Sequence, residues 1–191
     1  MADQLPQGFR AAGVYSGVKR NTNRLDLSLI VSEKPGVAAG VYTQNLVCGA
    51  PVQLNRERTP TETARAVVIN SGVANACTGE QGMRDAHEMA SRVADVCGCD
   101  QQDVLVMSTG VIGEFLPMDK ICSGIVAAAD DLAADEQALI NAARGMMTTD
   151  TVHKLRSRQI ELDCGPVQIT GIAKGAAMIG PNMATMLALI M

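Results

Sequence analysis

The chain has 191 residues, which is enough for one domain with a sizeable core. Its net charge of −4 gives no reason to expect a nucleic acid or an anionic membrane surface as a partner. The N-terminus has neither the pattern of a secretory signal nor that of a transit peptide, and no apolar run reaches membrane-spanning length. We therefore expect a cytoplasmic protein that binds neither nucleic acid nor membrane.

The core must be aliphatic, because tryptophan is absent and aromatic residues make up 2% of the chain. An export signal is absent and the cysteines lie in apolar surroundings, so we expect reduced and mostly buried thiols in place of disulfides. A zinc site is disfavoured because the chain has only two histidines and no second cysteine pair. The six cysteines are Cys48, Cys77, Cys97, Cys99, Cys122 and Cys164.

In chain order, the hydrophobic pattern predicts strands first, then strand–loop–helix units, and finally a hairpin. Helices are indicated by apolar residues at three- and four-residue spacing, and Pro35–Gly36 is expected to be a turn. The pattern predicts one α/β domain, a sheet with helices packed on its outer face. The expected strands are 8–18, 25–31, 36–43, 47–54, 66–70, 103–107, 159–163, 167–172 and 186–191, and the expected helices are 81–97, 118–129 and 135–144.

The last stretch of the chain carries the most distinctive chemistry. A lone Lys174 is followed by a loop rich in glycine and proline that reaches Ala184 and Thr185 and then enters an apolar strand. The hydroxyl of Thr185 could attack the preceding carbonyl and form an ester. After hydrolysis, the freed amine of Thr185 could act as the base for its own hydroxyl. The alternative is an ordinary strand residue at a loop-to-strand junction, since threonine favours strands.

The run from Lys174 to Leu187, Lys-Gly-Ala-Ala-Met-Ile-Gly-Pro-Asn-Met-Ala-Thr-Met-Leu, resembles the self-cleavage motif of the ornithine acetyltransferase family (glutamate N-acetyltransferase, arginine biosynthesis). The resemblance implies a cut between Ala184 and Thr185, with Thr185 as the nucleophile. It also implies a layered α/β sandwich of the ornithine acetyltransferase type, here only its N-terminal part. Residues 1–184 would be the α-chain region, one α/β domain, and residues 185–191 the first strand of the β chain. Because the chain ends inside an apolar strand, we expect a fragment or a separate remaining chain.

Three further segments gain a role from this resemblance. The Ser-Thr-Gly run at 108–110 follows an apolar strand, and the family's pattern makes Thr109 and Gly110 the oxyanion hole. The hydroxyl-rich run at 148–151 implies a substrate-binding Thr148, with Thr149 as the second choice. Lys174 is implied to hold a carboxylate of the substrate. Without the resemblance, the residues favour structural interpretations of the three segments: a capped turn, a helix-stop loop and a solvated charge.

The resemblance implies an enzyme that moves an acetyl group from N-acetylornithine to glutamate through an acetyl-threonine on Thr185. No metal or cofactor is expected, and acetyl-CoA stays open as a second donor. The expected partner is a β chain from the same precursor, in a heterotetramer of two α and two β chains. One alternative is a self-processing N-terminal-nucleophile amidohydrolase or aminopeptidase, which typically presents serine at the cut. Another is a non-catalytic fragment, and we expect these 191 residues alone to be inactive.

Overall fold

The computed structural model describes residues 3–163, 165–179 and 185–191, and in these ranges the chain forms two β-sheets. All neighbouring strands are antiparallel except β3 and β4, which are parallel. The first sheet has the order β1 (Phe9–Val14), β2 (Leu27–Ala38), β3 (Thr61–Val73) and β4 (Val104–Val111). The second has the order β5 (Lys154–Leu162), β6 (Gly165–Lys174) and β7 (Leu187–Ile190).

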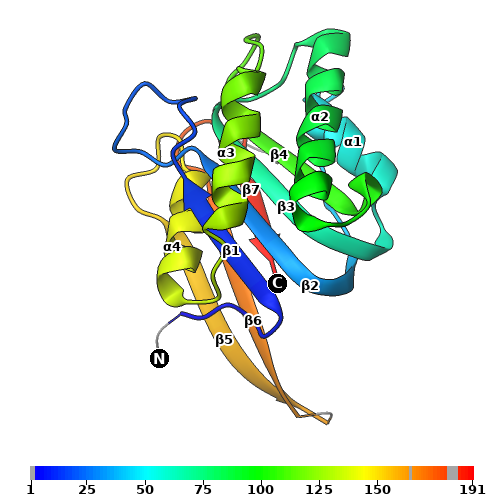
Figure 1. Ribbon diagram of the computed structural model, residues 1–191, viewed down its shortest axis with the longest axis vertical. Coiled ribbons are helices and arrows are strands. Elements are labelled where there is room, and N and C mark those ends of the chain that lie inside the picture. The colour runs from blue at the N-terminus through cyan, green and yellow to red at the C-terminus, as the bar shows by residue number, and fades with distance from the viewer. Residues whose placement is uncertain (1–2, 164, 180–184) are drawn as a thin grey trace.

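The helices are divided between the two faces of the first sheet (Figure 1). One face is covered by α1 (Ala50–Arg58), α2 (Gly79–Cys97) and α3 (Met118–Asp130). The opposite face packs against α4 (Glu136–Gly145) and against residues of the second sheet such as Ile172. The expectation that all helices lie on one outer face is therefore wrong for α4. A short 3₁₀ helix, η1 (Gln101–Asp103), precedes β4.

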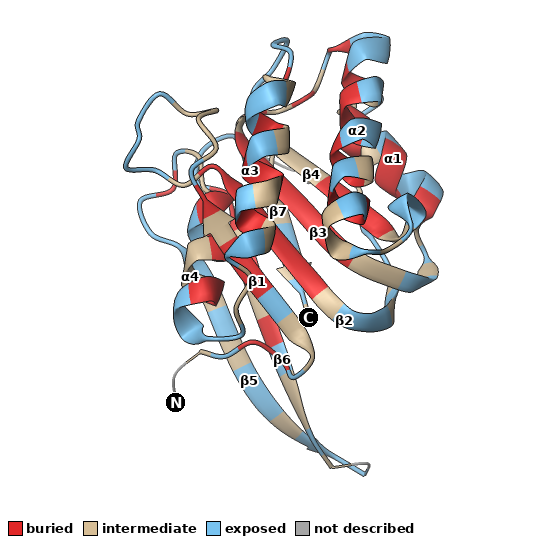
Figure 2. Cartoon of the chain, in the orientation of Figure 1, coloured by how far each residue is buried: buried red, intermediate tan, exposed pale blue. Residues whose placement is uncertain are grey.

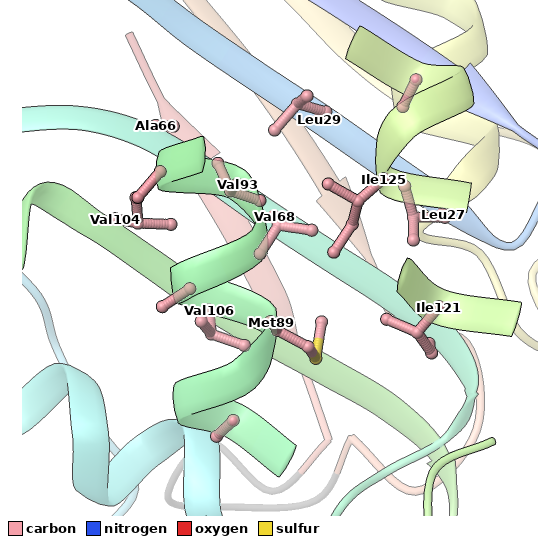
Figure 3. Packing of buried hydrophobic residues seen from close by; sticks show 14 of the residues in the cluster. Leu27, Leu29, Ala66, Val68, Met89, Val93, Val104, Val106, Ile121 and Ile125 are labelled. Atoms are coloured by element: carbon pink, nitrogen blue, oxygen red, sulfur yellow. The ribbon is translucent and has the colours of Figure 1, made fainter. Parts of the chain in front are cut away.

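The central strands are buried on both faces, which explains their continuous apolar runs. In β3, Val68 packs on the side of α1, α2 and α3, whereas Val67 and Ile69 pack on the side of α4 and the second sheet. Figure 2 shows this buried band running along the first sheet beneath the helices. Figure 3 shows Met89 and Val93 of α2 packed with β-strand side chains of the same cluster. The aliphatic core expected from the composition is thus split into two layers by one sheet.

The helix predicted over residues 81–97 is confirmed as α2, and the position of its C-terminal end has a clear cause. α2 buries Ala86, Met89, Ala90 and Val93, which recur at helical spacing on one side. Gly98 caps the helix in the left-handed conformation, with φ of +64°, where glycine avoids the steric penalty of a Cβ. The helix starts two residues earlier than expected, at Gly79.

Two predictions around prolines are wrong. The segment 47–54 is not a strand, because Pro51 occupies the first turn of α1, where its missing N–H has no intrahelical partner to lose. Pro35 and Gly36 do not form a turn, because β2 continues through them to Ala38 with shifts in its register to β3. β1 pairs with β2 only up to Ser32, so Pro35 lies where one edge of β2 is open and tolerates a residue without an N–H.

The second sheet ends in a long hairpin that extends beyond the helices (Figure 1). β5 begins at Lys154, five residues before the expected strand, and most of its residues are exposed. Among the described residues of the hairpin, only the C-terminal half of β6 is buried, at Thr170, Ile172 and Lys174. The hairpin is therefore anchored at one end, and that end carries Lys174.

The five described cysteines are free, as expected, but none of them is buried, so the expectation of buried thiols is wrong for these five. Cys77 is exposed and the others are half-buried, whereas Cys164 lies outside the described residues. Across the described ranges, no helix combines the length and the apolar character needed to cross a membrane.

Candidate active site

The Ser-Thr-Gly run lies at the end of β4, where β4 is paired with β3. Thr109 is aligned with Ser71 and Gly110 with Gly72 across the parallel pair. Gly110 has φ of +141°, and a Cβ there would lie 2.2 Å from the carbonyl carbon of Gly72. Glycine is therefore required at position 110 for the strand ends to approach this closely. Thr109 itself is 2% exposed, so its hydroxyl lies inside the protein.

Lys174 joins this strand end to the start of β7. It is the last residue of β6 and is 2% exposed. Its Nζ donates a hydrogen bond to Oγ1 of Thr109 at 3.0 Å and lies 3.5 Å from the carbonyl oxygen of Thr185. Thr185 has φ of +63°, which is a rare backbone conformation for a β-branched residue. The ammonium of Lys174 thus contacts Thr109, which lies 65 residues away in the sequence, and the backbone of Thr185, which lies 11 residues away. Ala184 lies outside the described residues.

A buried carboxylate ties the neighbouring segments together. Asp150 is 1% exposed, and its Oδ1 accepts hydrogen bonds from Nζ of Lys154 at 2.5 Å and from the amide of Gly175 at 2.8 Å. Its Oδ2 accepts from the amide of Thr148 at 3.3 Å. Asp150 therefore links the hydroxyl-rich loop, the start of β5 and the residue after Lys174.

The charges of this cluster shift one another's pKa values. Burial alone would raise the pKa of Asp150, but the hydrogen bonds from Lys154, Gly175 and Thr148 outweigh it and hold that pKa at about 2. Burial lowers the pKa of Lys174, the negative charge of Asp150 acts in the opposite direction, and Lys154 lowers it further. Asp150 is thus a fully charged counter-ion beside a buried ammonium.

The loop before Asp150 is held from the other side by the N-terminal segment. Nζ of Lys19 donates to the carbonyl oxygens of Met147 at 2.7 Å and of Leu25 at 2.6 Å. Arg24 donates to the carbonyl oxygen of Thr148 at 3.1 Å. Burial lowers the pKa of Lys19 to about 8, with smaller opposing and reinforcing effects from nearby charges. Thr148 is half-buried in this loop, and its neighbour Thr149 is exposed.

The structure therefore brings together Thr109, Lys174 and Thr185 directly, and it connects Thr148 to them through Asp150. Sequence reasoning missed Asp150 as the centre of this network. An aspartate in a threonine-rich stretch is typical of a local turn, so the sequence offers no signal for its long-range contacts. In the part of the chain that the structure describes, no group of three or more His, Cys, Asp and Glu residues is placed to hold a metal ion.

The Thr109–Gly110 step combines a buried hydroxyl with a residue that lacks a Cβ. The space that a Cβ of residue 110 would need is occupied by the main chain of β3. A threonine hydroxyl and a neighbouring backbone amide are the kind of donors that stabilise a negatively charged oxygen during acyl transfer. The buried ammonium of Lys174 contacts the carbonyl oxygen of Thr185, which places the backbone of the expected nucleophile beside this pair.

Comparison with known proteins agrees with these features. A sequence model of the ArgJ family matches residues 10–191. The arginine biosynthesis bifunctional protein ArgJ of Rhodopirellula baltica is 49% identical over 187 residues, which cover 98% of this chain and 45% of that protein. The protein of the same description from Caldanaerobacter subterraneus is 47% identical and is covered to 46%. The chain thus spans about half the length of the curated relatives that it matches.

Two crystal structures match almost the whole chain. The arginine biosynthesis bifunctional protein ArgJ of Bacillus halodurans is 41% identical with a TM-score of 0.89, over 96% of this chain and 95% of that one. Ornithine acetyltransferase complexed with ornithine from Mycobacterium tuberculosis is 38% identical with a TM-score of 0.86, over 97% of this chain and 96% of that one. The expected fold of the ornithine acetyltransferase type is confirmed. This chain belongs to the ArgJ family.

Proposed function

We propose that the protein carrying this chain is a self-processing N-acetyltransferase that moves an acetyl group from N-acetylornithine to glutamate through an acetyl-threonine on Thr185. The observation that supports it most is the position of Lys174, whose Nζ lies within 3.5 Å of both the Thr109 hydroxyl oxygen and the Thr185 carbonyl oxygen. The similarity to an ornithine acetyltransferase with bound ornithine supports the substrate class. The alternative, an amidohydrolase with the same self-processing logic, has no such support.

The first step of the proposed mechanism is self-cleavage. The hydroxyl oxygen of Thr185 attacks the carbonyl carbon of Ala184, the C–N bond breaks, and an ester forms while the amine of Thr185 is released. Water then hydrolyses the ester, which leaves a carboxylate on residue 184 and a free amine on residue 185. The positive φ of Thr185 supports this step, because backbone strain at Thr185 favours rearrangement of the peptide bond that links it to Ala184.

The second step is acetyl transfer in two halves. The freed amine takes the proton of the Thr185 hydroxyl, whose oxygen attacks the acetyl carbonyl of N-acetylornithine, and ornithine leaves with that proton. The amine of glutamate then attacks the acetyl ester and restores the hydroxyl. In both halves a tetrahedral oxyanion forms, and the Thr109 hydroxyl and the Gly110 amide are the proposed donors to it. Lys174 and Thr148 are proposed to position the substrate, with the ammonium facing a carboxylate.

The proposed assembly follows from the same cleavage. Residues 1–184 would be the α chain as one α/β domain, and residues 185–191 would be the start of a β chain, in a heterotetramer of two α and two β chains. N-acetylornithine and glutamate are the proposed substrates, with acetyl-CoA as a candidate second acetyl donor. No metal or other cofactor takes part in the proposed steps.

Self-cleavage is tested on the full-length precursor by intact mass and N-terminal sequencing. The expected result is two chains, the second of which begins with Thr185, and a Thr185→Ala variant that stays whole. A wild-type precursor that remains intact or is cut elsewhere contradicts the proposal.

The reaction itself is tested by incubating the processed protein with N-acetylornithine, with and without glutamate. Acetylglutamate should form only when glutamate is present, and the Thr185→Ala variant should lose at least about 10³-fold in kcat. Release of acetate at the same rate without any acceptor would favour the amidohydrolase instead.

A further inference from the structure

The bond between Lys174 and Thr109 has a direction that bears on the oxyanion hole. A charged lysine carries three N–H donors and no acceptor, so in their 3.0 Å contact the Thr109 hydroxyl must be the acceptor. The single proton of that hydroxyl then points away from Lys174 and is free to be donated elsewhere. A neutral lysine amine would have a lone pair, and the Thr109 proton could turn toward it. The charge on Lys174 therefore decides where the Thr109 proton points.

Burial works against that charge. Lys174 is 2% exposed, and moving an ammonium out of water favours its neutral form. The nearest opposite charge acting on it is Asp150, which is equally buried. Asp150 does more than lie nearby, because it also binds the amide of Gly175, the residue next to Lys174, at 2.8 Å. One carboxylate thus fixes the backbone on which Lys174 stands and supplies its counter-charge.

We propose that Asp150 is a positioning residue for catalysis, which holds Lys174 as a charged donor to Thr109 so that the Thr109 proton is directed to the oxyanion. This inference rests on the proposed acetyl transfer and adds a residue to its machinery. Asp150 touches no reacting atom and acts through Gly175 and Lys174. The sequence run 148–151 thereby contributes a carboxylate to the site as well as its hydroxyls.

Other charged groups lie near Asp150 and Lys174, and one of them also shifts the pKa of Lys174 in a defined direction. Lys154 binds Asp150 at 2.5 Å and lowers the pKa of Lys174, so it opposes the action of Asp150. Lys154 is partly exposed at the start of β5, with 44% of its side chain open to solvent, and its loss should leave the fold intact. The remaining charged groups lie on the N-terminal segment, where Lys19 interacts with both members of the pair and with its own neighbours Arg24 and Asp26.

The test compares the pH dependence of kcat in the full-length processed enzyme and two variants. The acidic limb reports the Thr185 amine, which must be neutral, and the alkaline limb reports Lys174, which must be charged. Asp150→Asn removes the counter-charge, so its alkaline limb should move to lower pH and its kcat at neutral pH should fall at least about tenfold. Lys154→Gln removes the opposing charge, so its alkaline limb should move to higher pH. Lys34→Gln, an exposed lysine on β2, is the matched control and should move neither limb.

Opposite shifts of the alkaline limb in the two variants are a result that a merely structural role would not produce. Unmoved limbs in both, with kcat changed only through protein stability, overturn the inference and leave the proposed function standing. If Asp150→Asn does not fold or does not process itself, the direction of the shift in Lys154→Gln decides alone. A wild-type enzyme that transfers no acetyl group removes the proposed function and this inference together.

Discussion

Three aspartates are buried in the part of the chain that the structure describes, and two of them, Asp26 and Asp150, have contrasting surroundings. Asp26 accepts hydrogen bonds from the amide and hydroxyl of Ser16 at 2.6 and 2.8 Å and from the amide of Lys19 at 2.9 Å. All of the partners of its carboxylate belong to one short loop. The carboxylate of Asp150 accepts from Thr148 in its own loop, from Lys154 at the start of β5, and from Gly175, which directly follows β6 and lies 25 residues away in the sequence.

The difference shows that burial alone does not identify a functional carboxylate. A carboxylate whose donors all lie in one loop accepts hydrogen bonds that those donors would otherwise make to water. It stabilises the fold of that loop, since each hydrogen bond to a charged group is worth about 1.5–3 kcal/mol. A carboxylate that binds segments far apart in the sequence sets their relative positions. Asp150 is of the second kind. Its partner Gly175 directly follows Lys174, whose ammonium contacts Thr109. Three experiments sharpen this distinction.

The largest expected effect is on kcat, in variants of Thr109, which accepts a hydrogen bond from Lys174. Thr109→Val keeps the shape of the side chain but removes the hydroxyl, and kcat should fall about 10²- to 10³-fold, as for other single oxyanion donors. Thr109→Ser keeps the hydroxyl and should recover most of the activity. Steady-state kinetics on the processed enzyme measure both. A Thr109→Val enzyme with wild-type kcat would remove Thr109 from the oxyanion hole.

An intermediate effect, on stability rather than catalysis, is expected at Asp26. Asp26→Asn turns one acceptor into a donor facing the Ser16 and Lys19 donors, and the free energy of unfolding should fall by about 1–3 kcal/mol. Urea unfolding of the full-length protein measures this loss, while kcat should stay within about threefold of wild type. If kcat fell as far as in Asp150→Asn, the contrast between the two carboxylates would be lost.

The smallest expected effect is on the free energy of unfolding at acidic pH. The pKa of Asp150 is lowered from its ordinary value of 3.8 to about 2, so its charge stabilises the folded state above pH 4 and this contribution is lost as the pH falls from 4 towards 2. Wild-type protein should therefore lose more unfolding free energy between pH 5 and pH 3 than the Asp150→Asn variant. Denaturant unfolding at each pH checks this, and parallel curves for the two proteins would contradict it.

Much of the fold was predictable because local patterns and the tertiary structure agree. The periodic apolar face and the glycine stop of α2 mark a helix in any context. Two of the predictions about local structure failed where a proline had two interpretations. Pro51 starts a helix and Pro35 lies inside a strand with one open edge, and only the pairing of neighbouring strands distinguishes these cases.

The site was predictable only in part for a similar reason. The motif around Lys174 and Thr185 is distinctive as a linear pattern, and the Ser-Thr-Gly run lies at a strand end where sites gather. The contacts of Asp150 depend on the hairpin of β5 and β6 returning beside the first sheet. A hydrogen bond between residues that lie 25 positions apart leaves no pattern in the local sequence. The aspartate could therefore be identified in the sequence, but its contact with Gly175 could not be predicted.

The close approach of Gly110 to Gly72 limits how this site can be redesigned. A side chain at position 110 would collide with the main chain of β3, not with a side chain that a second substitution could shorten. A library that randomises residues 108 to 111 and selects for acetyl transfer should therefore return glycine at 110 in every functional clone. Val111 is 51% exposed, so position 111 has more room for larger side chains than position 110, and new specificities are best sought there.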